Sequence, residues 1–347
     1  MYINFNHPEI SIEMSFLSEF EKKVSEFILD FLNDEKTVFV QTSGSTGKPK
    51  IYEVDKQKML NSAKMTCDFL NLNEENSALL CLPIEYISGK MMVVRAIKRK
   101  LNLKIIEPSS KPLENLEENI DFCAMTPLQV ENSLEKIHFI KKLIIGGGSV
   151  SETLKTKIFQ SLKSQISNPE SQIFETYGMT ETLSHIALKE IYPNPKDYFQ
   201  ILDGISISKD DRGCLIISAP KLNDEELITN DLVEIKNERE FRFLGRIDHV
   251  INSGGAKIFP EELEDLMKKS ISNELVFLGI PDETLGQKLV LVIEGQEDEN
   301  SKFKIQNSKF EKSFHHPKEI IFVEKIPRTP NGKIDRLKLL ANLTSNL

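Results

Sequence analysis

The sequence predicts an α/β protein: a large N-terminal domain with a βα-layered parallel sheet and a small β-rich subdomain, then a smaller α+β C-terminal domain. Short apolar runs alternate with helical patterns from about residue 38 to residue 188, which is typical of βα units around a parallel sheet. Between Ile201 and Arg246, short strand patterns broken by turn residues replace this alternation. A new helix and strand pattern begins after Asp248.

Hydrophobic periodicity predicts the individual elements in order. Apolar residues at three- and four-residue spacing from Phe16 to Leu32 predict an amphipathic helix, and residues 38–40 predict a strand. The runs SALLCLP, KIIEP, FCAMTP and KKLIIGGG predict further strands, while KMMVVRAIKRKL and SETLKTKIFQSL predict helices. Near the C-terminal end PEELEDLMKKS predicts a helix and KLVLVIEG a strand, and the charged stretch EGQEDENSKFK is interpreted as a solvated loop.

Composition excludes several classes of function. The chain has 347 residues, with 44 Lys and Arg against 53 Asp and Glu, and its formal charge of -9 disfavours nucleic acid and anionic membranes as partners. Four widely spaced cysteines predict neither a disulfide framework nor a zinc site, and fit a reducing compartment. No apolar run approaches the ~18 residues of a spanning helix, and the N-terminus has no basic stretch before an apolar core. We therefore expect a cytoplasmic protein without a membrane span.

The segment TSGSTGKPK, from Thr42 to Lys50, has the composition of a phosphate-binding loop. It offers two glycines, four hydroxyls and two lysines within nine residues, so backbone N–H groups, hydroxyls and ammonium groups can meet a polyphosphate together. The glycine spacing and the strand-like segment that follows distinguish it from a Walker A loop. A flexible hairpin turn is the alternative interpretation.

Together with four later segments in the same order, this loop resembles the signature of the acyl-adenylate-forming enzymes: acyl-CoA synthetases, adenylation domains and luciferases. The resemblance implies ATP and Mg²⁺ as cofactors, CoA as co-substrate and a small carboxylic acid as substrate. Only about forty residues precede the loop here, whereas members of the family usually carry a longer N-terminal region. The implied phosphate contacts are Thr42, Ser43, Gly44, Ser45, Thr46, Gly47, Lys48 and Lys50.

Two further segments resemble the family's adenine and adenylate motifs. In YGMTET the resemblance implies that Tyr177 and Gly178 line the adenine site, that Thr180 binds the α-phosphate and that Glu181 binds magnesium. An aromatic face suits a base, and a carboxylate suits a hard cation. In IIGGGSV the resemblance implies that Gly147 and Gly148 let adenine lie against the backbone, although an ordinary strand-to-helix turn would also explain these glycines.

The last segments resemble the ribose, hinge and catalytic-lysine motifs. In TNDL the resemblance implies that Asp231 accepts both ribose hydroxyls, with Asn230 in place of the usual glycine. In GRIDHVINSGG it implies a second ribose contact and a hinge between a large domain, residues 1–247, and a mobile C-terminal domain, residues 248–347. The residues implied are Arg246 for ribose, Asp248 for the hinge, Gly254 and Gly255 for the CoA channel, and Lys333 of PNGK as the catalytic lysine.

The acid-binding residues resemble those of one branch, the o-succinylbenzoate:CoA ligases of menaquinone biosynthesis. Arg95 falls where these ligases carry an Arg for the substrate's non-reacting carboxylate, and Ser184 and His185 fall near their acyl pocket. Tyr86 replaces the His of the usual LPxxHxSG motif and is expected to line the pocket. The alternative for Arg95 is a surface residue beside other basic side chains.

The resemblance thus implies an AMP-forming acid:CoA ligase that acts through an acyl-adenylate, with o-succinylbenzoate as the predicted acid. Three alternatives remain open: another aryl or acyl acid, an adenylation enzyme that loads a carrier protein, and a nucleotide-binding regulator without catalysis. The combination of Lys333, Glu181 and the phosphate loop argues against the regulator.

Overall fold

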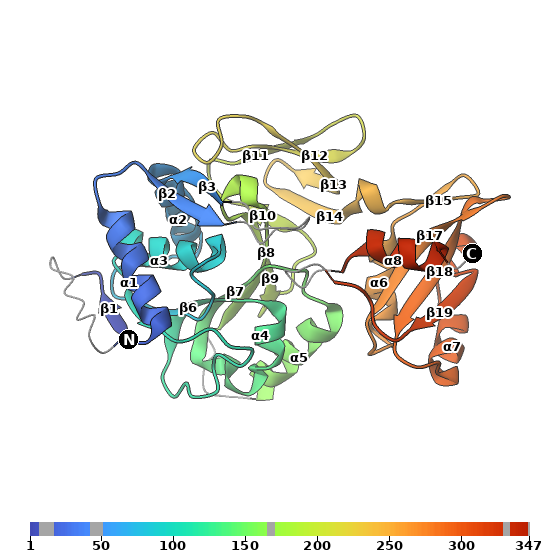
Figure 1. The fold of residues 1–347 in the computed structure, drawn as a ribbon, viewed down its shortest axis with the longest axis horizontal. Coiled ribbons are helices and arrows are strands. Elements are labelled where there is room, and N and C mark those ends of the chain that lie inside the picture. Colours follow the sequence, from blue (N-terminus) through green and yellow to red (C-terminus); the bar gives the residue numbers. More distant parts are fainter. Residues whose placement is uncertain (7–16, 42–50, 165–170, 329–333, 346–347) are drawn as a thin grey trace.

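The structure is a computed structural model that describes residues 1–6, 17–41, 51–164, 171–328 and 334–345. These residues form a twelve-stranded sheet, a five-stranded sheet and a two-stranded hairpin. Figure 1 shows the larger sheet and its helices at the left, and the five-stranded sheet in orange and red at the right. Helices packed on a large sheet confirm the predicted α/β class.

The larger sheet is parallel in its first half and antiparallel in its second. Its strands are β1 (Tyr2–Asn4), β4 (Ser77–Leu80), β5 (Asn102–Ile105), β6 (Ile120–Met125), β7 (Ile140–Ile145), β8 (Gln172–Gly178), β9 (His185–Tyr192), β10 (Phe199–Ile201), β11 (Ser206–Lys209), β12 (Cys214–Ser218), β13 (Leu227–Asn237) and β14 (Glu240–Arg246). Their order is β1-β5-β4-β6-β7-β8-β9-β10-β14-β13-β12-β11. Neighbours from β5 to β8 are parallel, and all other pairs are antiparallel. The strands predicted as a β-rich subdomain therefore continue the same sheet.

Helices cover both faces of the parallel strands. The helices of this part are α1 (Glu19–Leu32), α2 (Lys56–Phe69), α3 (Ile87–Arg99), α4 (Pro127–Glu131) and α5 (Glu152–Ser164), with short 3-10 helices η2 (Leu134–Phe139) and η3 (Thr180–Thr182). Alternate residues of each strand enter different cores: Leu80 and Phe122 pack with α1 to α3, while Leu79 and Cys123 pack on the side of α5. This alternation is why the apolar runs predicted strands that are buried on both faces.

The first helix illustrates how local sequence determines an element. Ser18 caps α1: its hydroxyl oxygen accepts from the backbone N–H of Glu21, and the Glu21 carboxylate accepts from the backbone N–H of Ser18. This reciprocal pair is a capping box. Its buried face carries Phe20, Val24 and Phe27, as the spacing predicted. The helix therefore begins after the cap, and Phe16 of the predicted span lies outside the described residues.

The C-terminal part has its own sheet and helices. Its strands are β15 (Ile251–Ser253), β16 (Ala256–Ile258), β17 (Leu275–Asp282), β18 (Gly286–Glu294) and β19 (Glu319–Val323). Its helices are α6 (Pro260–Met267), α7 (Glu299–Gln306) and α8 (Arg336–Thr344), with η5 (Ser313–His315), and η4 (Ile247–His249) joins it to β14. Two apolar clusters, one on each side of β17 and β18, contain only residues from 251 onward. The division at residue 247 remains a prediction.

The predicted solvated loop EGQEDENSKFK is partly wrong. Residues 299–306 form α7, because Asp298 caps it by accepting from the N–H groups of Asn300 and Ser301, and Ile305 is buried against the C-terminal core. The local cap and the buried residues Ser301 and Ile305 outweigh the high charge of the stretch. Separately, the hairpin outside both sheets pairs β2 (Thr37–Gln41) with β3 (Ile51–Asp55), which confirms the strands predicted on either side of the phosphate loop.

None of the helices in the described ranges is long and apolar enough to cross a lipid bilayer.

Strands β8 and β9 approach each other very closely at Gly178. A Cβ atom added there would overlap the carbonyl oxygen of Ser184 and the Cα of His185. Both obstacles are backbone, which cannot move without disturbing the strand pair, so only glycine fits.

Gly178→Ala should lower the free energy of unfolding by about 1–3 kcal/mol or more, because the added methyl group has no space. Gly148→Ala is the control, since the nearest atom to its Cβ would be Pro127 Cγ at 3.9 Å. Thermal and urea unfolding would compare the two variants. Equal stability of both would contradict the close approach at Gly178.

Candidate active site

Three loops that follow parallel strands meet at the carboxyl edge of the larger sheet. They run from Cys81 to Tyr86 after β4, from Gly146 to Ser151 after β7, and from Met179 to Ser184 after β8. Parallel neighbours end at the same edge, so these loops gather there. The sheet thus brings together the segments predicted to contact acid, adenine and adenylate.

The predicted phosphate loop, Thr42 to Lys50, lies outside the described residues. Its flanking residues are described: β2 ends at Gln41 and β3 begins at Ile51, opposite each other in the hairpin. Gln41 also forms a bridge with Tyr86, which precedes α3 and is 37% exposed. The chain therefore enters the predicted phosphate loop beside the predicted acid-binding segment.

The predicted catalytic Lys333 also lies outside the described residues, and the chain on both sides of it is anchored. Arg328 pairs with Ile334 across residues 329–333. Arg336 donates to both carboxylate oxygens of buried Glu264, at 2.8 and 2.6 Å. This largely buried ion pair, in which Nη2 alone makes both bonds, holds the start of α8 on the C-terminal sheet.

The residues predicted to contact ribose form one hydrogen-bonded group. The Tyr177 hydroxyl donates to Asp231 Oδ2 at 2.5 Å, and Arg246 Nη1 donates to Oδ1 at 3.3 Å. Asp231 and Arg246 are directly opposite in the β13 and β14 register. Burial, followed by the negative charge of Asp231, raises the pKa of the Tyr177 hydroxyl, so it stays protonated and donates.

The predicted hinge residue is linked to the same group. Arg246 Nη2 donates to Asp248 Oδ2 at 2.8 Å, and Asn230 Nδ2 donates to Asp248 Oδ1 at 3.2 Å. Arg246 lowers the pKa of the Asp248 carboxyl. Asn230, which replaces the family's glycine, therefore has a polar partner of its own.

The Tyr177 ring lies among other aromatic rings. It contacts Phe241 edge to face at 5.0 Å between centroids, and Phe199 at 5.8 Å. On the next turn, η3, Thr180 and Glu181 are exposed, as residues that meet phosphate and a cation must be. The adenine, phosphate and metal roles of these three residues remain predictions.

The glycine-rich loop after β7 is held by a residue that the sequence reasoning missed. Buried Glu175 accepts from the Val150 N–H at 3.0 Å, and its second oxygen pairs with Lys189 at 3.0 Å. Gly147 has a φ of +84°, which glycine adopts readily, whereas a Cβ at Gly148 would make only an ordinary contact with Pro127. The available signal was a glutamate inside an otherwise apolar strand, FETYG.

Three of the predicted acid-binding residues form a buried chain with one residue that was not predicted. Arg95 Nη2 donates to Ser184 Oγ at 2.7 Å. Ser184 Oγ lies 3.3 Å from His185 Nδ1, and His185 Nε2 lies 3.0 Å from Thr66 Oγ1. Thr66 belongs to α2 and is fully buried. No local pattern in the sequence linked this helix residue to the loop after β8.

Arg95 is a buried cation rather than the surface residue of the alternative interpretation. It is 2% exposed, and its Nε has no hydrogen-bond partner among the described residues. Within the same ranges no carboxylate pairs with it. Burial lowers its pKa to about 10, which leaves it positively charged at neutral pH.

The predicted CoA-channel glycines form a tight turn. Gly254 and Gly255 connect β15 to β16 with φ of +57° and +81°, the geometry of a two-residue hairpin that strongly favours glycine. The Gly254 N–H donates to Leu285 O at 2.8 Å. Turn geometry therefore explains both glycines, and the CoA contact remains a prediction.

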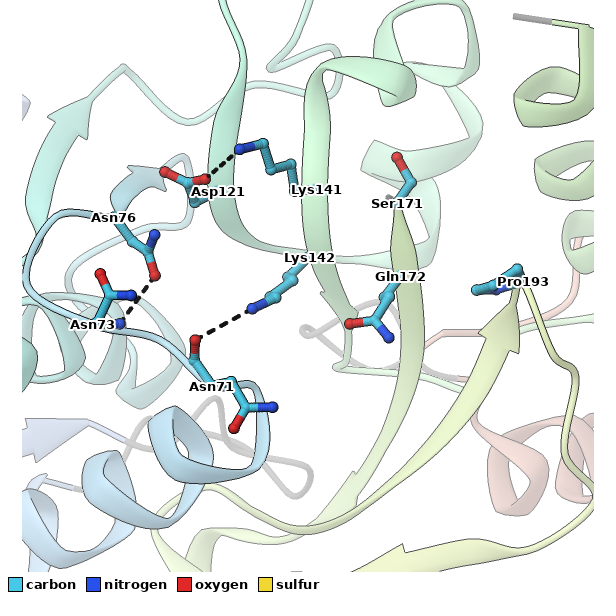
Figure 2. Close-up of a pocket in the computed structure, with 9 residues that line it drawn as sticks. All are labelled: Asn71, Asn73, Asn76, Asp121, Lys141, Lys142, Ser171, Gln172 and Pro193. Carbon is cyan, nitrogen blue, oxygen red and sulfur yellow. Dashed lines mark hydrogen bonds and ion pairs between the residues drawn. The ribbon is translucent and has the colours of Figure 1, made fainter. Parts of the chain in front are cut away.

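A cavity of about 480 Å³ lies away from these loops, at the amino ends of the same strands. Figure 2 shows its polar lining: Lys141 reaches Asp121, and Lys142 reaches the backbone of Asn71. These cations are thus already engaged by the protein. The cavity belongs to the opposite edge of the sheet from the candidate active site.

Across the described ranges no cluster of three or more His, Cys, Asp or Glu side chains could hold a metal ion by itself. A single carboxylate is still enough for the predicted magnesium. Mg²⁺ bound with a nucleotide takes one or two carboxylates, completing its shell with phosphate oxygens and water. Exposed Glu181 can supply that carboxylate.

Residues 18–203, just over half of the chain, match the AMP-binding enzyme family, and the chain belongs to that family. Among curated proteins it is similar to the 2-succinylbenzoate–CoA ligase of Listeria monocytogenes, at 27% identity over 94% of this chain and 74% of that protein.

Two solved structures are also similar. The chain is 33% identical to an acyl-CoA synthetase (AMP-forming)/AMP-acid ligase II-like protein from Dyadobacter fermentans, with a TM-score of 0.64 over 95% of this chain and 96% of that one. It shares the fold of the o-succinylbenzoate coenzyme A synthetase from Bacillus subtilis in complex with ATP and magnesium ion, at 19% identity and a TM-score of 0.72, over 87% and 69% of the two chains.

Replacing Tyr177 tests the predicted adenine contact. Tyr177→Ala should raise KM for ATP more than KM for the acid, because the stacking surface is lost. Tyr177→Phe keeps the ring, loses only the bond to Asp231, and should have the smaller effect. Steady-state kinetics with each substrate varied in turn would measure both. Equal increases for ATP and acid in Tyr177→Ala would indicate general damage instead.

Proposed function

We propose that this protein is an AMP-forming acid:CoA ligase that converts 2-succinylbenzoate, ATP and CoA into 2-succinylbenzoyl-CoA, AMP and pyrophosphate. The observation that carries the choice of acid is the buried charge of Arg95, which has no carboxylate partner among the described residues. The family and the relatives in the comparisons support the reaction class.

The physical argument concerns the cost of burying a charge. An isolated cation in a protein interior is strongly unfavourable unless a partner compensates it. A substrate with two carboxylates supplies such a partner: one carboxylate reacts and the other binds the guanidinium. Arg suits this task because its planar fork of donors matches a carboxylate. Ser184, which is only partly buried and bonds to Arg95, gives the ligand a route to it.

In the first half-reaction a carboxylate oxygen of the acid attacks the α-phosphorus of ATP. A new O–P bond forms, the bond to the bridging oxygen breaks, and pyrophosphate leaves with that electron pair. Lys333 would stabilise the charge that develops on the phosphate, and Thr180 would bind the α-phosphate. A magnesium ion held by Glu181 and the nucleotide would neutralise phosphate charge.

In the second half-reaction the CoA sulfur attacks the acyl carbon of the adenylate. A C–S bond forms, the bond from carbon to the AMP oxygen breaks, and the thiol proton passes to solvent. We propose that the C-terminal part turns about Asp248 between the two steps, so that Lys333 serves the first step and the Gly254–Gly255 turn serves the second.

Arg95→Ala should lower kcat/KM for 2-succinylbenzoate, because a charge-assisted pair is lost. The loss in transition-state binding free energy should be about 2–4 kcal/mol. Lys98→Ala, an exposed residue on the same helix, is the matched control and should leave kcat/KM unchanged. A pyrophosphate-release assay with a panel of acids, together with mass spectrometry of the products, would measure both. An unchanged Arg95→Ala enzyme would exclude this residue from acid binding. Adenylate without CoA thioester in the wild type would favour a carrier-protein ligase.

Lys333→Ala tests the assignment of the two half-reactions. Adenylate formation should fall by about 10² to 10³, the usual effect of removing one transition-state charge donor. Thioester formation from pre-made acyl-adenylate should stay near the wild-type rate, since the lysine acts only in the first step. Lys338→Ala, an exposed lysine on α8, serves as control. A similar loss in both half-reactions would contradict the assignment.

A further inference from the structure

The hydrogen bonds around His185 have one consistent direction. Thr66 has a single hydroxyl proton, which it donates to the carbonyl oxygen of Ser62 at 3.2 Å. Its oxygen can then accept from His185 Nε2, 3.0 Å away, which assigns the ring proton to Nε2. His185 Nδ1 is left with a lone pair, which accepts the Ser184 hydroxyl proton.

This direction determines what Ser184 offers to Arg95. Because its proton points to His185, the lone pairs of Ser184 Oγ are available to Arg95 Nη2 at 2.7 Å. The reverse direction would place a proton on Nδ1 and turn the Ser184 hydroxyl proton away from the ring. That proton would then have no acceptor in the described structure, and Ser62 O would lose its bond from Thr66.

Thr66 and the His185 ring are buried, so water cannot easily replace a missing bond between them. Thr66 is 0% and His185 7% exposed. Burial, and then the charge of Arg95, lowers the pKa of His185 well below its usual range, so the ring is neutral. A neutral ring has one donor and one acceptor, which is what Thr66 and Ser184 require.

We propose that Thr66 is a positioning residue that determines specificity: by accepting the Nε2 proton of His185, it keeps both lone pairs of Ser184 Oγ available to Arg95 and so orients the guanidinium toward the non-reacting carboxylate of the substrate. This inference rests on the proposed function. It adds Thr66 of α2, which belongs to none of the predicted site segments, to the recognition of the second carboxylate.

Removing the hydroxyl of Thr66 reverses the direction of the hydrogen bond between His185 and Ser184. In Thr66→Val the buried Nε2 proton has no partner, which is costly, so the ring proton moves to Nδ1. Nδ1 then donates to Ser184 Oγ and occupies one of its two lone pairs, while the Ser184 hydroxyl proton turns away from the ring. The guanidinium shares the Ser184 oxygen with a second donor, so the orientation of Arg95 is held less firmly. Thr66→Ser keeps the hydroxyl and serves as the matched control.

The kinetic test compares a dicarboxylic acid with acids that have lost one carboxylate. For Thr66→Val, KM for 2-succinylbenzoate should rise about tenfold while kcat and KM for ATP change less than about twofold. The preference for 2-succinylbenzoate over 3-benzoylpropanoate and 2-butanoylbenzoate should fall by a similar factor. Thr66→Ser should restore the wild-type values. An unchanged preference in Thr66→Val, or an equal rise of KM for ATP, would overturn the inference.

A second measurement needs no turnover. Proton–nitrogen correlation spectra of the ¹⁵N-histidine-labelled enzyme, with His185 assigned from a His185→Gln sample, should show the Nε2-protonated tautomer in the wild type and in Thr66→Ser. Thr66→Val should show the Nδ1-protonated form. An Nδ1-protonated wild type would overturn the inference even if the valine variant proved too unstable for kinetics.

Arg95→Ala separates this inference from the proposed function. If Arg95→Ala loses the preference for 2-succinylbenzoate and Thr66→Val keeps it, only the role of Thr66 is wrong. If neither variant changes the preference, the binding of a second carboxylate by Arg95 is wrong as well.

Discussion

The close approach of β8 and β9 at Gly178 is the constraint on which the candidate site depends. Strand β8 is parallel to β7 on one side and antiparallel to β9 on the other, so it is where the sheet changes from one pattern to the other. Gly178 allows the backbone of Ser184 and His185 to lie directly against it. The same strand carries Glu175, which holds the glycine-rich loop, and Tyr177, which holds Asp231. One strand thus positions both ends of the site.

The two ends of the candidate site differ in how their charges are compensated. At the end predicted to bind ribose, the carboxylate of Asp231 is already compensated by Tyr177 and Arg246, so a neutral ribose could exchange hydrogen bonds there without leaving a bare charge. At the end predicted to bind the acid, buried Arg95 has the Ser184 hydroxyl and the sulfur of Met92 as its hydrogen-bond partners in the part of the chain that the structure describes. A charged ligand gains most at the second end, because the interior strengthens an interaction that nothing else satisfies.

The sequence predicted much of this arrangement and missed specific parts of it. Motif residues such as Tyr177, Asp231 and Arg246 were predictable because a short segment identifies each, and β pairing then unites them. Glu175 and Thr66 were not, because their roles depend on partners 25 and 119 residues away, which no local pattern reveals. Helix α7 was missed because charge suggested a loop, although its Asp298 cap was visible in the sequence.

The contacts of Asp248 are compatible with a hinge on energetic grounds. Its ion pair with Arg246 is about half exposed on both sides, and exposed pairs of this kind contribute only about 0–1 kcal/mol. Breaking it during a rotation would therefore cost little. The Tyr177 to Asp231 bond is less exposed, and it lies between β8 and β13 within one sheet, so it need not change when the C-terminal part moves. Weak, exposed contacts at η4 and stronger, buried ones behind it would let the C-terminal part turn while Tyr177 and Asp231, predicted to lie beside the nucleotide, keep their geometry.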